Sequence, residues 1–262
     1  MSNGYKHYAG LKGSKIKTVG SDADIYQYTS LATCFGDAQP NDVIEIHDGT
    51  YTLTAAITID YSVTLVGLGN VVITGAVADR LFMINKPAAG TTVTTIRASN
   101  IQFTNTTASA DCIEMDNDGG GTGNLVTEWN DCGFTSNAGL AFDIDQTTAT
   151  IDVFHYINGN RRRPLDDDCN FSLTKAGSEI HVSGYLLGGG ETFILGATDV
   201  ASVYFFNDII FSSAALTSTG AASIIMNMTN CAKIASDAIV APALGDLDAT
   251  GDENILVGSI LT

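Results

Sequence analysis

The fold is decided between residues 42 and 73, where the chain reads Asp42-Val-Ile-Glu-Ile-His47, Thr50-Tyr-Thr-Leu53, Ile57-Thr-Ile59, Val63-Thr-Leu65 and Val71-Val-Ile73. Apolar residues mostly occupy every second position, which is the pattern of a strand with one buried face. The turns between these segments are too short to hold a helix. Because strands this short cannot bury a face in an ordinary open sheet, they predict a chain that coils and stacks each strand on the strand one turn earlier.

A six-residue motif repeats farther along the chain, and its spacing supports a coil. It reads Asn100-Ile-Gln-Phe-Thr-Asn105, Asp131-Cys-Gly-Phe-Thr-Ser136, Asp208-Ile-Ile-Phe-Ser-Ser213 and Cys231-Ala-Lys-Ile-Ala-Ser236. Phe103, Phe134, Phe211 and Ile234 are then equivalent, at steps of 31, 77 and 23 residues, and 77 residues divide into three turns of about 26. The two turns in between are expected near Tyr156-Ile157 and Tyr185-Leu186. An antiparallel sandwich with similar short strands is the alternative.

The stretch that decides the fold resembles the first coils of right-handed parallel β-helices of the pectate-lyase-like superfamily. The resemblance lies in Ile25 to Gly36, Asn41, Asp42, Asp48 to Tyr51, Ile57, Ile59, Val63 to Gly67, Gly69 and Ile73 to Gly75, within a span of about a fifth of the chain. It implies an all-β fold, a right-handed single-stranded parallel β-helix. It says little about function, because the superfamily includes polysaccharide lyases, hydrolases, esterases, adhesins and phage virion proteins.

The sequence predicts one domain, preceded by a short arm. A solenoid keeps a constant cross-section, so residues 21–262 add turns and not further domains. Residues 21–38 are expected to form a capping helix with Ser21 as N-cap. Residues 1–20 have no period of two or 3.6, so this arm is either disordered or ordered by docking onto a partner, and its mixture of Tyr, His and Lys favours docking. The residues expected to make that contact are Lys6, Lys12, Lys15, Lys17, Tyr5, Tyr8 and Leu11.

The charge and the cysteines restrict the classes of partner. The formal net charge is −17, from 12 Lys and Arg against 29 Asp and Glu, and such a balance repels nucleic acid and anionic lipid surfaces. No apolar segment follows Met1 and no run of 18 apolar residues exists, so we expect synthesis in a cytoplasm, with neither a signal peptide nor a membrane span. Five cysteines without paired spacing are expected to be buried thiols, and no cofactor is implied.

One loop concentrates charges of both signs: Arg161, Arg162 and Arg163 are followed by Asp166, Asp167 and Asp168. The resemblance implies two uses for such a loop, since β-helix lyases use Arg or Lys as a base and the related hydrolases use paired Asp residues. However, the motifs of those enzymes are missing, with no Asn-x-Asp followed by Asp-Asp, Gly-His-Gly and Arg-x-Lys. A solvated loop with internally paired charges is the simpler interpretation, and a protein contact is the third.

Metal and histidine sites are also conceivable from the pattern. Asp116 and Asp118 begin a loop like that of a calcium-binding EF-hand, but position 12 is Thr127 and not Glu, so turn chemistry explains the loop equally well. His155 and His181 are one turn of about 26 residues apart, and stacking of coils could bring them together. Outward members of the run Val203-Tyr204-Phe205-Phe206 would suit sugar stacking or a subunit interface.

These features together resemble a virion component of a tailed bacteriophage more than an enzyme. Phage virion proteins of this fold are usually trimers, and they leave the host by lysis and so need no signal peptide. We therefore expect a non-enzymatic capsid decoration or cement protein, bound as a homotrimer to the major capsid protein or another virion protein. A tailspike or fibre that binds carbohydrate, a glycan-binding adhesin, and a polysaccharide lyase or hydrolase are the alternatives.

Overall fold

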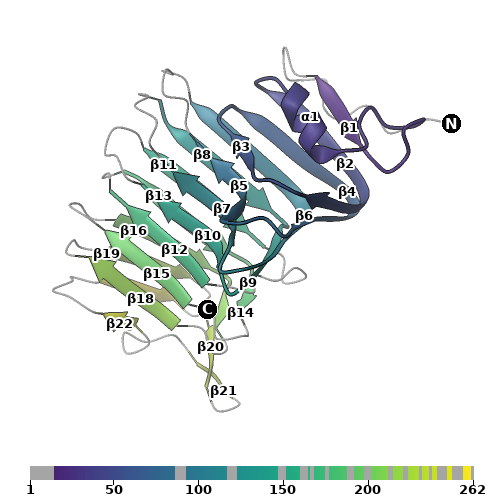
Figure 1. Ribbon diagram of the computed structural model, residues 1–262. Helices are drawn as coiled ribbons and strands as arrows, with labels where there is room; N and C mark the ends of the chain where they lie inside the picture. Colours follow the sequence, from purple (N-terminus) through teal and green to yellow (C-terminus); the bar gives the residue numbers. More distant parts are fainter. Residues whose placement is uncertain are drawn as a thin grey trace.

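The chain forms a parallel β-solenoid in which successive coils stack strand upon strand (Figure 1). The computed structural model describes residues 15–85, 93–116, 123–146, 152–159, 165, 168–174, 177–187, 192–197, 202–211, 215–220, 224–229, 232–235, 238–240, 247–249 and 256–260. Within these residues every strand pairing is parallel except one near the C-terminus. The predicted β-helix is therefore confirmed, and the antiparallel sandwich is wrong.

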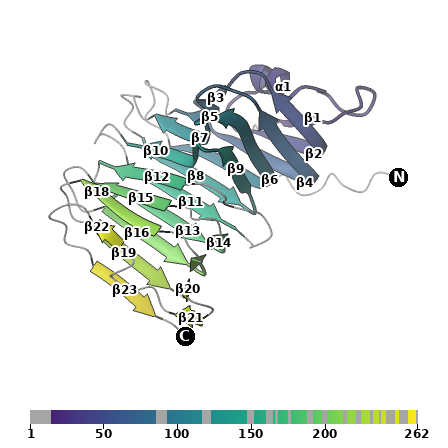
Figure 2. The same cartoon turned by 60° about the horizontal axis from the view of Figure 1, so that its bottom comes forward.

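The described strands form three sheets at the sides of the coil. Sheets A and B run along most of its length in both views, whereas sheet C begins only at residue 186 (Figure 2). Sheet A has the order β1 (Ile16–Val19), β2 (Asp42–Leu53), β4 (Val63–Gly75), β6 (Thr94–Ala108), β8 (Leu125–Asn130), β11 (Val153–Asn158), β13 (Glu179–Ser183), β16 (Ser202–Asn207), β19 (Ile224–Thr229) and β23 (Leu256–Ile260), with β9 (Gly133–Asn137) beside β6. Sheet B has the order β3 (Ile57–Ile59), β5 (Arg80–Ile84), β7 (Asp111–Asp116), β10 (Leu140–Asp145), β12 (Asp168–Leu173), β15 (Thr192–Ala197), β18 (Ala215–Gly220) and β22 (Leu247–Ala249). Sheet C has the order β14 (Leu186–Leu187), β17 (Ile210–Phe211), β20 (Ala232–Ala235) and β21 (Ala238–Val240).

The five segments quoted above form three strands, because pairing continues around two of the turns. β2 joins the first two segments and β4 joins the last two, and their register shifts between His47 and Gly49. Gly69 has φ +98°, a conformation that residues with a side chain seldom adopt, so glycine permits the corner in β4. The side chain of Asp48 fixes that corner by accepting a hydrogen bond of 2.7 Å from the backbone N–H of Asn70.

Coils differ in length although their strands keep register. The register pairs Val63 with Ile96, a step of 33 residues, and pairs Val182 with Phe206, a step of 24 residues. The difference lies in the connections, because the paired strands remain in contact at the constant spacing of a parallel sheet. The predicted period of about 26 residues is thus an average over unequal coils.

One helix occurs in the described part of the chain: α1 (Leu31–Asp37) packs over the first coil at the end of the solenoid that lies near the N-terminus (Figure 1). The predicted helix began too early, because Ser30 and not Ser21 is the N-cap and its hydroxyl accepts from the N–H of Thr33. Tyr28 pairs with β1 instead, donating its N–H to the carbonyl of Thr18 at 3.0 Å. A residue held in an extended pairing cannot belong to a helix. Leu31, Cys34 and Phe35 face the core, as expected for a cap.

One file of inward side chains runs up the coils and contains two of the three predicted phenylalanines. The register aligns Tyr51, Ile73, Phe103, Phe134 and Leu165, all of which are buried. The rings of Phe103 and Phe134 are stacked, with centroids 5.3 Å apart and planes 6° from parallel. The equivalence of these two residues is confirmed.

The later members of the repeat are placed differently from the prediction. Leu165, and not Tyr156-Ile157, continues the file, because Ile157 aligns with Trp129 in sheet A. The expected turn at Leu186 is present, since β14 pairs with β17. Phe211 aligns with Lys233 rather than Ile234. Ile234 lies one position farther on, in the antiparallel pair of β20 and β21 that interrupts the parallel order.

The core also contains one histidine. His155 is 1% exposed, and its Nδ1 lies 2.5 Å from the hydroxyl oxygen of Thr127, which also accepts from the indole N–H of Trp129 at 3.1 Å. Its Nε2 is buried without a hydrogen-bond partner. His155 aligns with Ile180, whereas His181 aligns with Tyr156 on the outer side of the sheet. The expected meeting of His155 and His181 is therefore wrong, because consecutive residues of a strand point to opposite faces.

Four cysteines, Cys34, Cys112, Cys132 and Cys169, are buried in the core, as the composition predicts. Burial raises the pKa of the Cys34 thiol to about 12, so this thiol stays protonated at neutral pH. Cys231 lies outside the described residues.

Replacing Phe103 with alanine tests the stacked file. Phe103 contacts the rings of Phe82, Trp129 and Phe134, so Phe103→Ala should lower the free energy of unfolding by about 3 to 5 kcal/mol through lost burial and a cavity. Thr104→Ala, at the next and partly exposed position, should change it by less than about 0.5 kcal/mol. Denaturant titration measures both values. A loss below about 1 kcal/mol for Phe103→Ala would contradict the stacked core.

The buried histidine should make the fold sensitive to acid. Burial lowers the pKa of His155 to about 3, whereas an unfolded histidine titrates near 6.5. Between these values the unfolded chain binds a proton that the folded chain does not, so stability falls as the pH falls from about 6.5 towards 3. His155→Leu should remove about 2 kcal/mol of the loss that the wild type shows between pH 6.5 and 5. His181→Gln on the outer face is the control, and equal pH slopes for wild type and His155→Leu would exclude the mechanism.

Candidate contact surface on the outer wall of sheet A

The charged loop that the sequence singled out is described only at its edges. Arg161, Arg162, Asp166 and Asp167 lie outside the described residues. Asp168 begins β12 and aligns with Leu140 of β10. Leu165, between the two charged groups, is buried in the file of Phe134. The loop is thus anchored to the core at its centre, and its proposed catalytic use stays a prediction.

The arm is shorter than predicted, because β1 already belongs to sheet A. Lys17 is buried, its Nζ lies 3.8 Å from a carboxylate oxygen of Asp42, and it donates to the hydroxyl of Tyr28 at 3.3 Å. Lys17 is therefore a structural residue of the cap and cannot serve as an exposed docking cation. Lys15 is exposed, and its backbone N–H donates to Asp42. The other expected contacts, Lys6, Lys12, Tyr5, Tyr8 and Leu11, lie outside the described residues.

Of the two residues considered for a metal, only Asp116 lies among the described residues. Asp116 ends β7 and aligns with Asp145, while Asp118 lies outside the described residues. Thr127, at the position where an EF-hand would need Glu, is buried in the core beside His155. Within the described ranges no group of three His, Cys, Asp or Glu residues is arranged to hold a metal ion.

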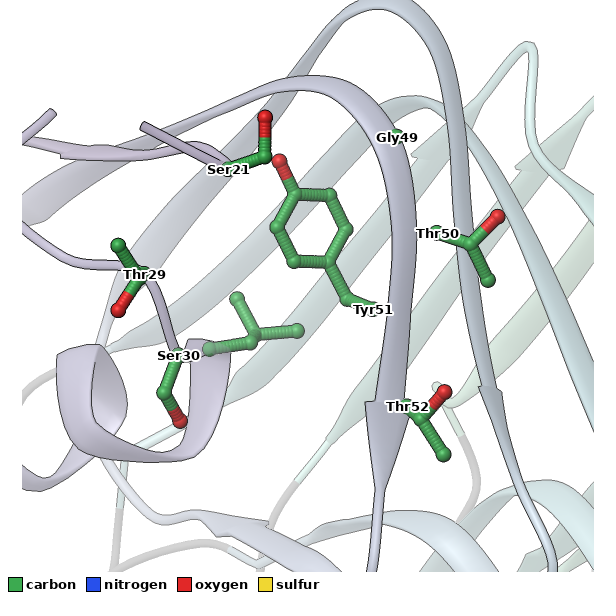
Figure 3. Close-up of a pocket in the computed structure, with 8 residues that line it drawn as sticks. Ser21, Thr29, Ser30, Gly49, Thr50, Tyr51 and Thr52 are labelled. Atoms are coloured by element: carbon green, nitrogen blue, oxygen red, sulfur yellow. The ribbon is translucent and has the colours of Figure 1, made fainter. Parts of the chain in front are cut away.

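A cavity of about 240 Å³ lies between the cap and the first coil (Figure 3). Figure 3 shows the ring of Tyr51 at its centre, with Ser21 near the phenol and Thr29 and Ser30 beside the helix. The Tyr51 hydroxyl lies 2.6 Å from the carbonyl of His47, to which it donates, and the Ser30 hydroxyl is the helix cap. The lining residues carry hydroxyl groups but no ionised side chain, so the cavity lacks an acid or base for catalysis.

The outer wall of sheet B is acidic. Asp111, Glu114, Asp143 and Asp168 lie on it, and the one guanidinium beside them in the described residues, Arg80, pairs with Glu114. The pKa of Asp111 is raised because burial disfavours its charged form, although the carboxylate accepts a 2.7 Å hydrogen bond from the N–H of Leu140. Asn170 donates to Asp143 at 2.8 Å. These contacts join neighbouring coils, which gives the carboxylates a structural use.

The outer wall of sheet A is different, because aromatic and amide side chains line it. We define this wall by three files of outward residues in β6, β8, β11, β13 and β16. The first file is Thr95, Val126, Phe154 and Glu179; the central file is Arg97, Glu128, Tyr156, His181 and Phe205; the third is Ser99, Asn130, Asn158, Ser183 and Asn207. Each file follows the register, so its members lie one above another at the spacing of paired strands.

Three members of the central file, Tyr156, His181 and Phe205, form a stack of partly exposed rings. The imidazole of His181 lies between Tyr156, at 4.7 Å and 27°, and Phe205, at 4.3 Å and 11°. Its Nε2 lies 2.9 Å from a carboxylate oxygen of Glu179. At the other end of the file the guanidinium of Arg97 forms two hydrogen bonds with Glu128, of 2.8 and 3.1 Å. The file therefore has a charged half and an aromatic half.

The third file is a ladder of hydrogen bonds between coils. Asn158 donates its amide to Asn130 at 2.9 Å, and Ser183 donates its hydroxyl to Asn158 at 2.8 Å. The ladder holds the rungs in register beside the rings, so the wall is stiff as well as partly apolar.

Phe205 belongs to the run predicted to offer outward aromatic residues, whereas Tyr156 and His181 were considered for other roles and Phe154 was not singled out. The signal was the alternation of β11, in which Phe154 and Tyr156 flank the inward His155. No helix of the described residues has the length and hydrophobicity needed to span a membrane. Comparison with models of protein families, with curated proteins and with solved structures found no match for this chain.

Proposed function

We propose that this chain is a non-enzymatic structural protein of a tailed-phage particle, a capsid decoration or cement protein that acts by protein contact. The observation that carries the proposal is the outer wall of sheet A. It offers partly exposed rings in a stiff, regular array, and aromatic residues are enriched at protein interfaces. The phage setting rests on the resemblance of residues 25–75 to β-helices of virion proteins, which is an analogy of fold.

The geometry of the rings favours a protein partner over a glycan. A sugar stacks on the face of an aromatic ring, but Tyr156 and Phe205 cover the two faces of His181, and each of them loses one face in return. What the central file presents to solvent is therefore mainly ring edges. Ring edges carry partial positive charge and pack well against other aromatic or apolar groups, as protein interfaces do.

Purified particles provide the direct test of this function. Phage particles from the host that encodes the chain should contain it in many copies, as measured by quantitative mass spectrometry. Purified protein should also bind again to particles from which its gene has been deleted. Recovery only in the soluble lysate, or release of oligosaccharides from a capsular polysaccharide by the purified protein, would contradict the structural role.

Two truncations separate the arm from the cap. Removal of residues 1–14 leaves β1 intact and should leave the melting temperature unchanged, but it should abolish binding to particles if the arm docks the protein. Removal of residues 1–20 also deletes β1 and should destabilise the fold by about 2 kcal/mol or more, because the buried Val19 and the pairing with β2 are lost. Full binding by the shorter truncation would show that the arm is not the contact.

A further inference from the structure

The occupant of the outer wall of sheet A is restricted by charge. The chain carries a formal charge of −17, and the outer wall of sheet B concentrates carboxylates, so copies of this protein repel one another over most of their surface. The three files of sheet A contain only Arg97, Glu128 and Glu179 as ionised residues, counting His181 as neutral. Two copies therefore approach one another most easily through this wall.

The pattern of the central file also distinguishes between the ways of joining two walls. If two copies meet with their axes parallel, every rung faces its own equivalent, so Glu128 faces Glu128 and Arg97 faces Arg97. Like charges placed directly opposite each other are unfavourable. If the axes are antiparallel and Tyr156 lies on the two-fold axis, the file Arg97, Glu128, Tyr156, His181 and Phe205 faces its own reverse. Glu128 then faces His181, and Arg97 faces Phe205.

The antiparallel arrangement avoids facing like charges, and it also matches shape. Arg97 borders a shallow recess of about 150 Å³, lined by Asn41, Ser62, Val63, Thr64, Val93, Thr95 and Arg97. The partly exposed ring of Phe205 from the second copy would lie opposite this recess, where its edge would pack against the aliphatic part of the Arg97 side chain. In the first file Phe154 would face Phe154, and in the third file Asn158 would face Asn158.

We propose that the outer wall of sheet A binds a second copy of this chain, antiparallel and two-fold symmetric, with Tyr156 on the axis. Such an isologous contact is closed, so it forms a pair and not a filament. This inference rests on the proposed function as a protein of assembled particles, and it names the contact between copies. It favours a pair over the homotrimer that the sequence led us to expect, because a parallel trimer with this wall on its three-fold axis would bring equal charges together.

The mass in solution gives the first test. At micromolar concentration the wild type should sediment with twice the 27.4 kDa of one chain. Tyr156→Lys places two cations on the axis and should raise the dissociation constant at least about tenfold. Ser172→Lys is the matched control, since Ser172 lies outward on sheet B in the same coil, and it should remain a pair. A wild type of one or three chains would overturn the proposal.

Cysteine cross-linking gives the second test, and it shows whether the axes of the two copies are parallel or antiparallel. In a Cys231→Ser background, Tyr156→Cys should form a disulfide with its own copy under mild oxidation, because a residue on a two-fold axis meets itself. Arg97→Cys and Phe205→Cys should each fail alone and should cross-link when the two variants are mixed. Self-cross-linking of either one would indicate parallel walls and overturn the antiparallel pair.

Failure of the pair and failure of the proposed function give different results. A protein that is abundant in particles but remains a single chain, and that loses particle binding with Tyr156→Lys, would show that the wall binds another virion protein. That outcome overturns the pair and leaves the structural role intact. Absence from particles together with antiparallel cross-linking would overturn the structural role and leave the pair intact.

Discussion

The stacking of every coil on the coil before it is the constraint on which this structure depends. A single three- to six-residue strand buries too little apolar surface to be stable alone, so the inward file of one coil completes the core of the next. Phe103 and Phe134 show the result, since their rings stack with planes 6° from parallel across two coils. Polar groups follow the same rule, because Asn130, Asn158 and Ser183 satisfy one another between coils.

Stacking also explains why the two sides of one sheet differ so sharply. Inward positions must fit a closed core, where even His155 is kept neutral beside Thr127. An outward side chain of sheet A needs only to pack against the aligned side chains on the strands above and below it. Rings, amides and charges each form files for this reason, and the files create a surface with a regular order along the axis. The candidate contact surface is thus a consequence of how the solenoid stays in register.

The architecture was predictable from residues 42–73 because a period of two and short turns leave few ways to bury those strands. The limits of the capping helix were not predictable. Tyr28 fits a helical pattern, but in the structure it forms hydrogen bonds with Thr18 and Gly20 instead. The file of Phe134 was followed correctly for one coil and then lost, because unequal connections place Leu165 where Ile157 was expected. The outer wall was missed for the same reason: its members become neighbours only through a register that depends on those connections.

Unequal connections have a further meaning for how such a chain can change over time. The step from Val63 to Ile96 is nine residues longer than that from Val182 to Phe206, yet both pairs of strands remain aligned. Insertions and deletions in the connections therefore leave the sheets in register, because the entropic cost of closing a loop grows only slowly with its length. The connections between strands can therefore change in length during evolution, while the spacing of the outer wall and its fit to a binding partner are preserved.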